Sequence, residues 1–226
     1  DLPIGRNRVA SSPKHFAAYG QCAGGRNFAP ANVPERLFRE EILEPFRKAV
    51  KIGHIKGIMP SHSEIDGIPA HTNEWLLTGV LREELGFDGV VVSDYHDVER
   101  LNILHHIVSD NTDAAKAALK AGVNFDLPIS TCYKTLTDEI RGNREYMAIL
   151  DKRVSEILKL KFEMGLFENP YSDGRDFAER KKTRDSLTYL AAAKAVILLK
   201  NENGILPLDR RKIKKIAVVG PNADVV

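Results

Sequence analysis

The chain has 226 residues, of which 33 are basic and 31 acidic, so its formal net charge is +2. A hydrophobic fraction of 43% and a charged fraction of 28% are ordinary for a globular protein, and they exclude a disordered tail, a coiled coil or a collagen-like chain. The near balance of charge argues against nucleic acid as a partner. No apolar run approaches the roughly 20 residues that span a bilayer, so no membrane partner is expected.

Four short β-like runs recur along the chain, and each is followed by a helical pattern. They start near residues 8, 55, 89 and 122, and so lie 47, 34 and 33 residues apart. A strand-plus-helix unit takes about 30 residues or more, so this spacing predicts consecutive units. The adjacent valines at 90–92 predict a strand buried on both faces, as in a parallel sheet covered by helices. A closed (β/α)8 barrel takes about 250 residues, so four units make half a barrel or one open sheet.

Helical patterns fill the intervals between these runs. The first begins at Pro34, with a kink expected at Pro45. A second is capped by Asn73 and closed by Gly86. A third covers 112–121, and a fourth ends before Gly165. The fourth carries apolar residues at helical spacing on one side, namely Leu150, Val154, Ile157, Leu158 and Phe162.

The composition changes after Gly165. Nine of the 15 residues at 172–186 are charged, which is typical of a solvated linker. A further helix is expected from Ser186 to about Lys200, followed by a turn at 203–204 and a strand at 215–219. These elements predict the opening of a second α/β domain.

Reactive side chains follow the ends of the β-like runs, where parallel α/β proteins carry their chemistry. The first run leads into Lys14 and His15, and the second leads toward His62. The third leads into Asp94 and Asp97, and the fourth ends at Asp126. Polar loops would give a similar pattern, so this placement alone predicts a site without naming a reaction.

Motifs for several other functions are absent or incomplete. The chain has no Gly-x-Ser-x-Gly, Walker A or Cys-x-x-Cys sequence. The run at 216–221 is similar to a dinucleotide-binding strand, but Asn222 stands where a second glycine is required. The histidines do not fall at a zinc spacing, so no metal is expected, and with these motifs missing no organic cofactor is expected either. Cys22 and Cys132 either form one bridge or stay free.

Blocks of sequence in a fixed order resemble glycoside hydrolase family 3 over nearly the whole chain. They are Lys-His-Phe at 14–16, Gly-Ile-Met-Pro-Ser at 57–61 with Glu-Ile-Asp-Gly-Ile-Pro-Ala-His at 64–71, Trp-Leu-Leu-Thr at 75–78, Gly-Phe-Asp-Gly-Val-Val-Val-Ser-Asp-Tyr at 86–95, Gly-Leu-Phe-Glu-Asn-Pro-Tyr at 165–171 and Val-Ile-Leu-Leu-Lys-Asn at 196–201. The resemblance implies an α/β fold, the C-terminal half of a (β/α)8 TIM-like barrel followed by the start of an α/β sandwich domain. Residues 1–166 would belong to the barrel, 167–186 would form a charged linker, and 187–226 would begin the sandwich.

The resemblance also implies a retaining, exo-acting β-glycosidase that removes terminal β-D-glucosyl or β-D-xylosyl residues from oligosaccharides or from aryl and alkyl β-glycosides. Asp94 corresponds to the family's nucleophile, and Lys14 and His15 correspond to its sugar-binding pair. Tyr95 would border the sugar. His62 stands where many members have tyrosine, and it would hydrogen-bond the nucleophile and shape the subsite. The acid/base is expected from the rest of the parent chain, outside these residues.

Two alternatives stay open at this stage. One is a Schiff-base barrel enzyme that uses the amine of Lys14. The other is a non-catalytic carbohydrate-binding relative, against which the presence of Asp94 argues. A homo-oligomer is possible. The chain begins at Asp1 without a leader segment, so the compartment, whether extracellular, periplasmic or cytoplasmic, is left open.

Overall fold

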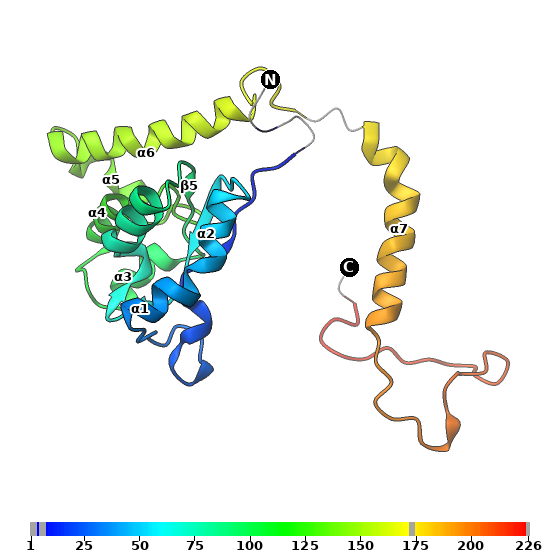
Figure 1. Cartoon of the computed structure of the whole chain (residues 1–226). Coiled ribbons are helices and arrows are strands. Elements are labelled where there is room, and N and C mark those ends of the chain that lie inside the picture. The colour runs from blue at the N-terminus through cyan, green and yellow to red at the C-terminus, as the bar shows by residue number, and fades with distance from the viewer. Residues whose placement is uncertain (1–3, 5–7, 172–174, 225–226) are drawn as a thin grey trace. The chain divides into compact units, whose positions relative to one another are not determined.

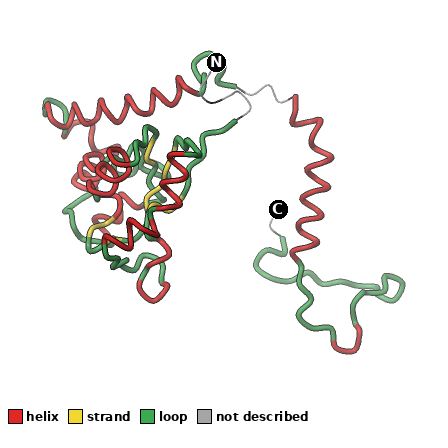
Figure 2. Tube along the Cα trace, viewed as in Figure 1, coloured by secondary structure: helices red, strands yellow, loops and turns green. Residues whose placement is uncertain are grey.

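The computed structural model describes residues 4, 8–171 and 175–224. The chain divides into two compact units, Asp1–Tyr171 and Ser172–Val226 (Figure 1). The helices of the first unit are α1 (Glu35–Leu37), α2 (Glu44–Lys51), α3 (Asp97–Ile103), α4 (Asn111–Ala121), α5 (Leu136–Glu139) and α6 (Arg144–Glu163), with π-helical turns η3 (Phe38–Ile42) and η5 (Trp75–Glu84) and short 3-10 turns η1 (Tyr19–Gln21), η2 (Ala23–Gly25), η4 (Ala70–Thr72) and η6 (Tyr133–Thr135). Its short strands lie between these helices (Figure 2).

A parallel sheet forms the centre of the first unit. Its strands are ordered β1 (Lys14–Phe16), β2 (Gly57–Pro60) and β5 (Val90–Val91). An isolated parallel bridge between Val92 and Phe125 continues this order to a fourth segment. A separate antiparallel pair, β3 (Glu64–Ile65) and β4 (Ile68–Pro69), follows β2. Because consecutive units are neighbours and run parallel, their carboxyl ends meet at one edge of the sheet. The predicted α/β arrangement is therefore present, while closure into a barrel stays a prediction.

The first strand begins later than the sequence predicted. β1 starts at Lys14 rather than within 8–12, so Lys14 and His15 lie on the strand instead of following it. The backbone upstream still runs beside β2, because the Gly57 amide donates to the Ser11 carbonyl at 3.0 Å. A Cβ atom on Gly57 would lie 2.9 Å from Cβ of Ser12, so this close approach requires glycine.

The helices between the strands follow their sequence signals with two changes. The helix predicted from Pro34 is broken into α1, η3 and α2. Pro45 lies in the first turn of α2, where its missing N–H has no intrahelical partner to lose. Asn73 caps η5 as predicted, since its side-chain oxygen accepts a hydrogen bond from the Leu76 amide at 3.0 Å. Gly86 follows the helix with a φ of 73°, a conformation that favours glycine.

The hydrophobic core lies between the sheet and the helices that cover it. Its largest fully buried side chains come from β1, β2, η3, η5, α3 and α4, among them Phe16, Phe38, Ile58, Leu76, Leu77, Leu81, Leu101 and Leu119. Burying one such side chain stabilises the fold by about 1.5–3 kcal/mol, so this cluster holds the strand ends in place. Cys22 and Cys132 are both buried and both free.

α6 is attached to the first unit through polar side chains and through only part of the predicted apolar face, of which Leu150 packs against the core. Val154 and Leu158 are each 41% exposed, whereas Arg153 is only 4% exposed. The Arg153 guanidinium donates to the Gly122 carbonyl at 3.2 Å. Glu156, one turn along α6, accepts hydrogen bonds from Asn124 Nδ2 at 2.8 Å and from Arg82 Nη2 at 3.1 Å.

The second unit contains α7 (Arg175–Ala195) and the short turn η7 (Glu202–Gly204). α7 begins inside the predicted linker, so much of that charged segment is helical rather than extended, and the helix starts well before Ser186. The strand predicted at 215–219 is wrong, because residues 175–224 contain no strand and Val219 is 85% exposed. None of the described helices has the length and apolar content that a membrane span requires.

Candidate active site

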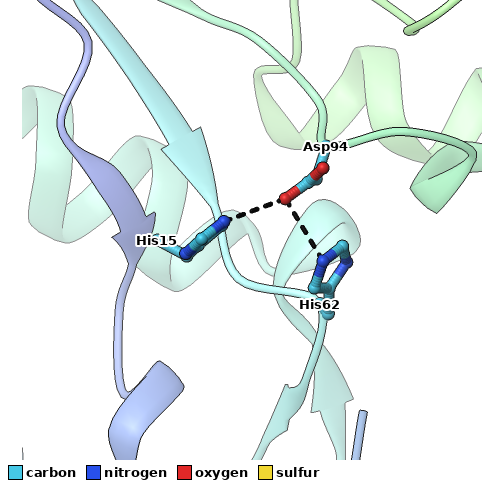
Figure 3. A group of neighbouring side chains, drawn as sticks. All are labelled: His15, His62 and Asp94. Carbon is cyan, nitrogen blue, oxygen red and sulfur yellow. Dashed lines mark ion pairs between the residues drawn. The ribbon is translucent and has the colours of Figure 1, made fainter. Parts of the chain in front are cut away.

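Side chains from three neighbouring strand ends converge on Asp94. His15 lies on β1, His62 follows β2 and Asp94 follows β5 (Figure 3). The Nε2 atoms of His15 and His62 lie 3.0 Å and 3.2 Å from Asp94 Oδ2. Lys14 Nζ lies 3.7 Å from the same oxygen. The structure therefore brings the predicted Lys14, His15 and His62 around the predicted nucleophile.

The backbone holds Asp94 at a sharp turn. Asp94 Oδ1 accepts a hydrogen bond from the Tyr95 amide at 2.7 Å, and the Asp94 amide donates to Nε2 of His71 at 3.2 Å. The chain then turns through His96, whose φ is 64°, before α3 begins at Asp97. Asp94 is 9% exposed, so its carboxylate is fixed by its neighbours.

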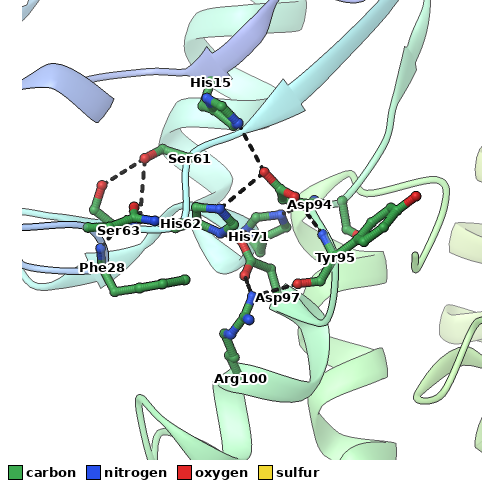
Figure 4. Close-up of polar contacts among 12 residues, drawn as sticks. His15, Phe28, Ser61, His62, Ser63, His71, Asp94, Tyr95, Asp97 and Arg100 are labelled. Atoms are coloured by element: carbon green, nitrogen blue, oxygen red, sulfur yellow. Dashed lines mark hydrogen bonds and ion pairs between the residues drawn. The ribbon is translucent and has the colours of Figure 1, made fainter. Parts of the chain in front are cut away.

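Tyr95 contributes to the site through its backbone. Its ring is directed away from the histidines (Figure 4), and the residue is 58% exposed. Its amide contacts Asp94, and its carbonyl accepts a hydrogen bond from Arg100 at 2.5 Å. The predicted contact between the Tyr95 ring and a sugar therefore stays a prediction.

Two of the histidines beside Asp94, His15 and His71, favour the neutral form. Burial and the charge of Lys14 lower the pKa of His15, although Asp94 acts in the opposite direction. A neutral His15 with its proton on Nε2 donates a hydrogen bond to Asp94 rather than forming an ion pair with it. Burial also lowers the pKa of His71. Because Nε2 of His71 accepts from the Asp94 amide, the proton of this neutral ring is on Nδ1.

Asp97 lies behind His62 and is itself tightly held. Its Oδ2 is 2.7 Å from Nδ1 of His62, and its Oδ1 accepts from Arg100 Nη1 at 2.5 Å. Burial acts to raise the pKa of Asp97, but the hydrogen bonds from His62 and Arg100 and the electrostatic interactions with His71 and His62 outweigh it, so that pKa lies below its usual value. Sequence reasoning placed Asp97 at a strand end and missed Arg100. The signal was the spacing of three residues between them, which pairs side chains on a helix.

Aromatic rings from the loop after β1 cover the histidines. The centres of the Phe28 and His62 rings lie 4.5 Å apart. The Arg100 guanidinium lies 4.7 Å from the centre of the Phe28 ring. The Tyr19 ring lies 4.5 Å from the His15 ring. Tyr19 also lines a hollow of about 240 Å³ together with Gly20, Cys22, Gly25, Arg26 and Asn27. This loop thus restricts how His15 and His62 move.

Three of these residues have atoms that ligate metals. His15, His62 and Asp94 each offer one such atom, and these atoms lie within 4.8 Å of one another. Two imidazoles and a carboxylate form a common ligand set for zinc. However, Lys14 Nζ lies 3.7 Å from the same Asp94 oxygen, and its positive charge opposes a cation at that point. A site without metal or organic cofactor stays a prediction.

Comparison with known families places the chain in one class. A family model described as "Glycosyl hydrolase family 3 N terminal domain" matches residues 4–160. A second, described as "Glycosyl hydrolase family 3 C-terminal domain", matches residues 196–226. The chain belongs to glycoside hydrolase family 3, which confirms the resemblance seen in its sequence blocks.

Relatives with curated names and solved structures extend this finding. A β-xylosidase from Formosa agariphila is 42% identical over 96% of this chain and 31% of its own length. A periplasmic β-glucosidase from Salmonella typhimurium is 35% identical over 98% of this chain and 29% of its own. The structure of a β-glucosidase from Erythrobacter marinus superposes with a TM-score of 0.75 at 40% identity, covering 89% of this chain and 27% of that one. The chain therefore spans about three tenths of the length of these relatives.

Proposed function

We propose that this chain carries the nucleophile of a retaining, exo-acting β-glycosidase that removes terminal β-D-glucosyl or β-D-xylosyl residues. One observation carries the proposal: in a family 3 chain, Lys14, His15 and His62 all approach one oxygen of a carboxylate at the sheet edge. The names of the relatives, β-xylosidase and β-glucosidase, support the substrate class. The substrates are oligosaccharides or aryl and alkyl β-glycosides.

The chemistry of retention assigns Asp94 its role. One carboxylate attacks the anomeric carbon and forms a covalent glycosyl-enzyme, while an acid protonates the leaving oxygen. Asp94 is the attacking group. Asp97 is 3% exposed and hydrogen-bonded through both oxygens, so it is not placed to protonate a leaving group. We propose, as the family resemblance implies, that the acid/base comes from the rest of the parent chain.

Lys14 and His15 bind the sugar beside the nucleophile. The Lys14 side chain is 47% exposed, so its ammonium reaches hydroxyls in the subsite while it stays near Asp94. Its hydrogen bonds to hydroxyls are charge-assisted and hence stronger than those between neutral groups. His62 and Tyr95 complete the subsite, His62 by its contact with Asp94, whose Oδ2 lies 3.2 Å from His62 Nε2, and Tyr95 by bordering the sugar.

The domain arrangement follows the same proposal. Residues 1–166 form the C-terminal part of a TIM-like (β/α)8 barrel, 167–186 lead out of it, and 187–226 begin an α/β sandwich. The order β1, β2, β5 and the bridge at Phe125 supports the barrel, because neighbouring parallel strands in chain order are what such a barrel contains.

A mechanism-based label tests the nucleophile. In the full-length protein, a 2-fluoro-β-glycoside with a good leaving group should esterify Asp94, because fluorine destabilises the oxocarbenium-like state and slows release of the intermediate. Peptide mapping by mass spectrometry locates the label. Replacing Asp94 by Asn should reduce kcat by far more than tenfold, and a loss within about tenfold, or ~1.4 kcal/mol, contradicts a nucleophilic role.

The matched control is Asp88→Asn, which removes a carboxylate that is 51% exposed and pairs with Lys56 and Lys159 on the surface. This variant should keep its activity and its label. A label on any residue other than Asp94 overturns the assignment. Borohydride trapping of substrate on Lys14 would instead establish the Schiff-base alternative.

A further inference from the structure

His62 lies between two carboxylates, one on each side of its ring (Figure 4). Its Nε2 is 3.2 Å from Asp94 Oδ2, and its Nδ1 is 2.7 Å from Asp97 Oδ2. A neutral imidazole has one N–H donor and one lone pair, whereas ionised carboxylates only accept hydrogen bonds. Only the imidazolium, which donates from both nitrogens, satisfies both contacts.

Asp97 is fixed from the side opposite His62. Arg100 Nη1 donates both to Asp97 Oδ1 and to the Tyr95 carbonyl, each at 2.5 Å. The Arg100 guanidinium also lies 4.7 Å from the centre of the Phe28 ring, which packs against His62. Because Asp97 is 3% exposed, water does not compete for its oxygens. The carboxylate is therefore a rigid acceptor for the ring.

Resting on the proposed function, we propose that Asp97 is a positioning residue that acts through His62. It directs the Nε2–H of His62 at the nucleophile and holds a positive charge on the ring beside Asp94. A buried aspartate orients a histidine in the same way in Ser-His-Asp triads. Here the ring serves a carboxylate nucleophile, so it gives no proton away during the reaction.

The two chemical steps use this charge differently. In the first step Asp94 bonds to the anomeric carbon, the bond to the leaving oxygen breaks, and that oxygen takes a proton from the acid outside this chain. The Asp94 carboxylate loses its negative charge in this step, so the cation on His62 stabilises the starting carboxylate. In the second step water bonds to the anomeric carbon, the bond to Asp94 breaks, and its electron pair returns to the carboxylate. The proton of that water goes to the base outside this chain. The charge of His62 therefore favours the second step, in which the carboxylate departs.

Asp97→Asn isolates this effect with little change in shape. Arg100 would still donate to the side-chain oxygen of the new asparagine, so its NH2 group would face Nδ1 of His62. That nitrogen would then accept, leaving a neutral ring that still donates from Nε2 to Asp94. The matched control is Glu99→Gln, two residues along α3, where the carboxylate pairs only with His96 among the ion pairs of the described residues.

The experiment follows reactivation of the labelled full-length protein. Each variant is inactivated with a 2-deoxy-2-fluoro-β-glycosyl fluoride, freed of excess reagent and assayed as activity returns. Asp97→Asn should reactivate at least about tenfold more slowly than the unsubstituted protein, with a smaller change in the inactivation rate, while Glu99→Gln matches the unsubstituted protein. His62→Gln should slow reactivation to a similar extent, and adding Asp97→Asn to it should have no further effect.

The outcomes separate this inference from the proposed function. If Asp94 of the unsubstituted protein takes no label, both fail. If Asp94 is labelled but reactivation is unchanged in Asp97→Asn and in His62→Gln, only the positioning role is overturned. Losses that add in the double variant also overturn it, because an effect carried by the ring disappears when the ring is absent. Thermal unfolding of each variant identifies any that fail to fold. If Asp97→Asn fails to fold, the reactivation rate of His62→Gln, which leaves the pair between Asp97 and Arg100 intact, decides whether the positioning role holds.

Discussion

Two valine-containing runs in this chain have opposite surroundings. Val90 and Val91 are buried in β5, where the Val90 amide donates to the Lys56 carbonyl at 2.9 Å. Val218 and Val219 are 72% and 85% exposed, and the described residues place no strand beside them. Backbone groups in a strand need partners on a neighbouring strand. The difference shows that an apolar run forms a strand in this chain only where a neighbouring segment pairs with its backbone.

The two long helices show the same contrast. α6 is held to the first unit by Arg153 and Glu156, which reach Gly122 and Asn124. In α7 the described side chains beyond residue 180 are nearly all exposed, and a surface pair such as Lys181 with Asp185 joins residues of the same helix. A polar residue therefore fixes a helix in this chain only where it contacts another element.

The largest expected effect distinguishes these two kinds of ion pair. Glu156→Ala should destabilise the first unit by about 3–5 kcal/mol, because it leaves the buried guanidiniums of Arg82 and Arg153 without their carboxylate. Asp185→Ala, its matched control on α7, should change stability by no more than about 0.5 kcal/mol. Urea titrations of the chain, followed through its single tryptophan, Trp75, measure both. Equal losses of stability in Glu156→Ala and Asp185→Ala would show that the buried and the exposed ion pairs contribute alike.

A second pair of variants compares apolar side chains. Leu77 is 0% exposed and Leu199 is 92% exposed. Leu77→Ala should lower the free energy of unfolding by about 2–5 kcal/mol, since it removes packed methyl groups and leaves a cavity. Leu199→Ala should shift it by less than about 0.5 kcal/mol. A loss at Leu199 comparable to that at Leu77 would show that the second unit has a core of its own.

The smallest effect is a dependence on pH that belongs to the first unit, because residues 172–226 contain no histidine. Burial lowers the pKa of His71 and His15 in the folded state. Below about pH 6.5 the unfolded chain therefore binds more protons, and stability falls as pH decreases, by at most about 1.4 kcal/mol per pH unit for each histidine. Above that pH their contribution is fully present.

Chemical unfolding at pH 7.5, 6.5 and 5.5 measures this slope. His71→Gln should reduce the slope, because it removes a buried group that must stay neutral. A slope that His71→Gln leaves unchanged contradicts the assignment of a neutral His71 beside Asp94. The lowered pKa of Asp97 acts with the same sign at more acidic pH, since its folded carboxylate resists protonation.

The sequence predicted what depends on local pattern and spacing. The parallel order of the strands followed from the spacing of the β-like runs, and the meeting of His15, His62 and Asp94 followed from their places at strand ends. The contact between Asp97 and His62 joins segments 35 residues apart and has no local signal. The same holds for the burial of Arg153, because a charged residue on a helix is ordinarily solvated.

The start of α7 was missed for a different reason. Its charged residues were interpreted as a linker, but lysine, arginine and glutamate are also good helix formers, and they need no buried face when oppositely charged residues follow at four-residue spacing. Charge density alone therefore does not separate an extended linker from an exposed helix.

The order of the sheet has a consequence for how this site diversifies. Each strand-and-helix unit delivers its own contribution at the same edge: His15 from the first, His62 from the second and Asp94 from the third. Residues 57–86 therefore supply only one of the side chains beside the carboxylate, and replacing this segment by the matching segment of a homologue would change that side chain without changing Asp94 itself. Recombination between family members at the boundaries of these units would therefore change the surroundings of Asp94 while it keeps the order of the parallel sheet formed by β1, β2 and β5.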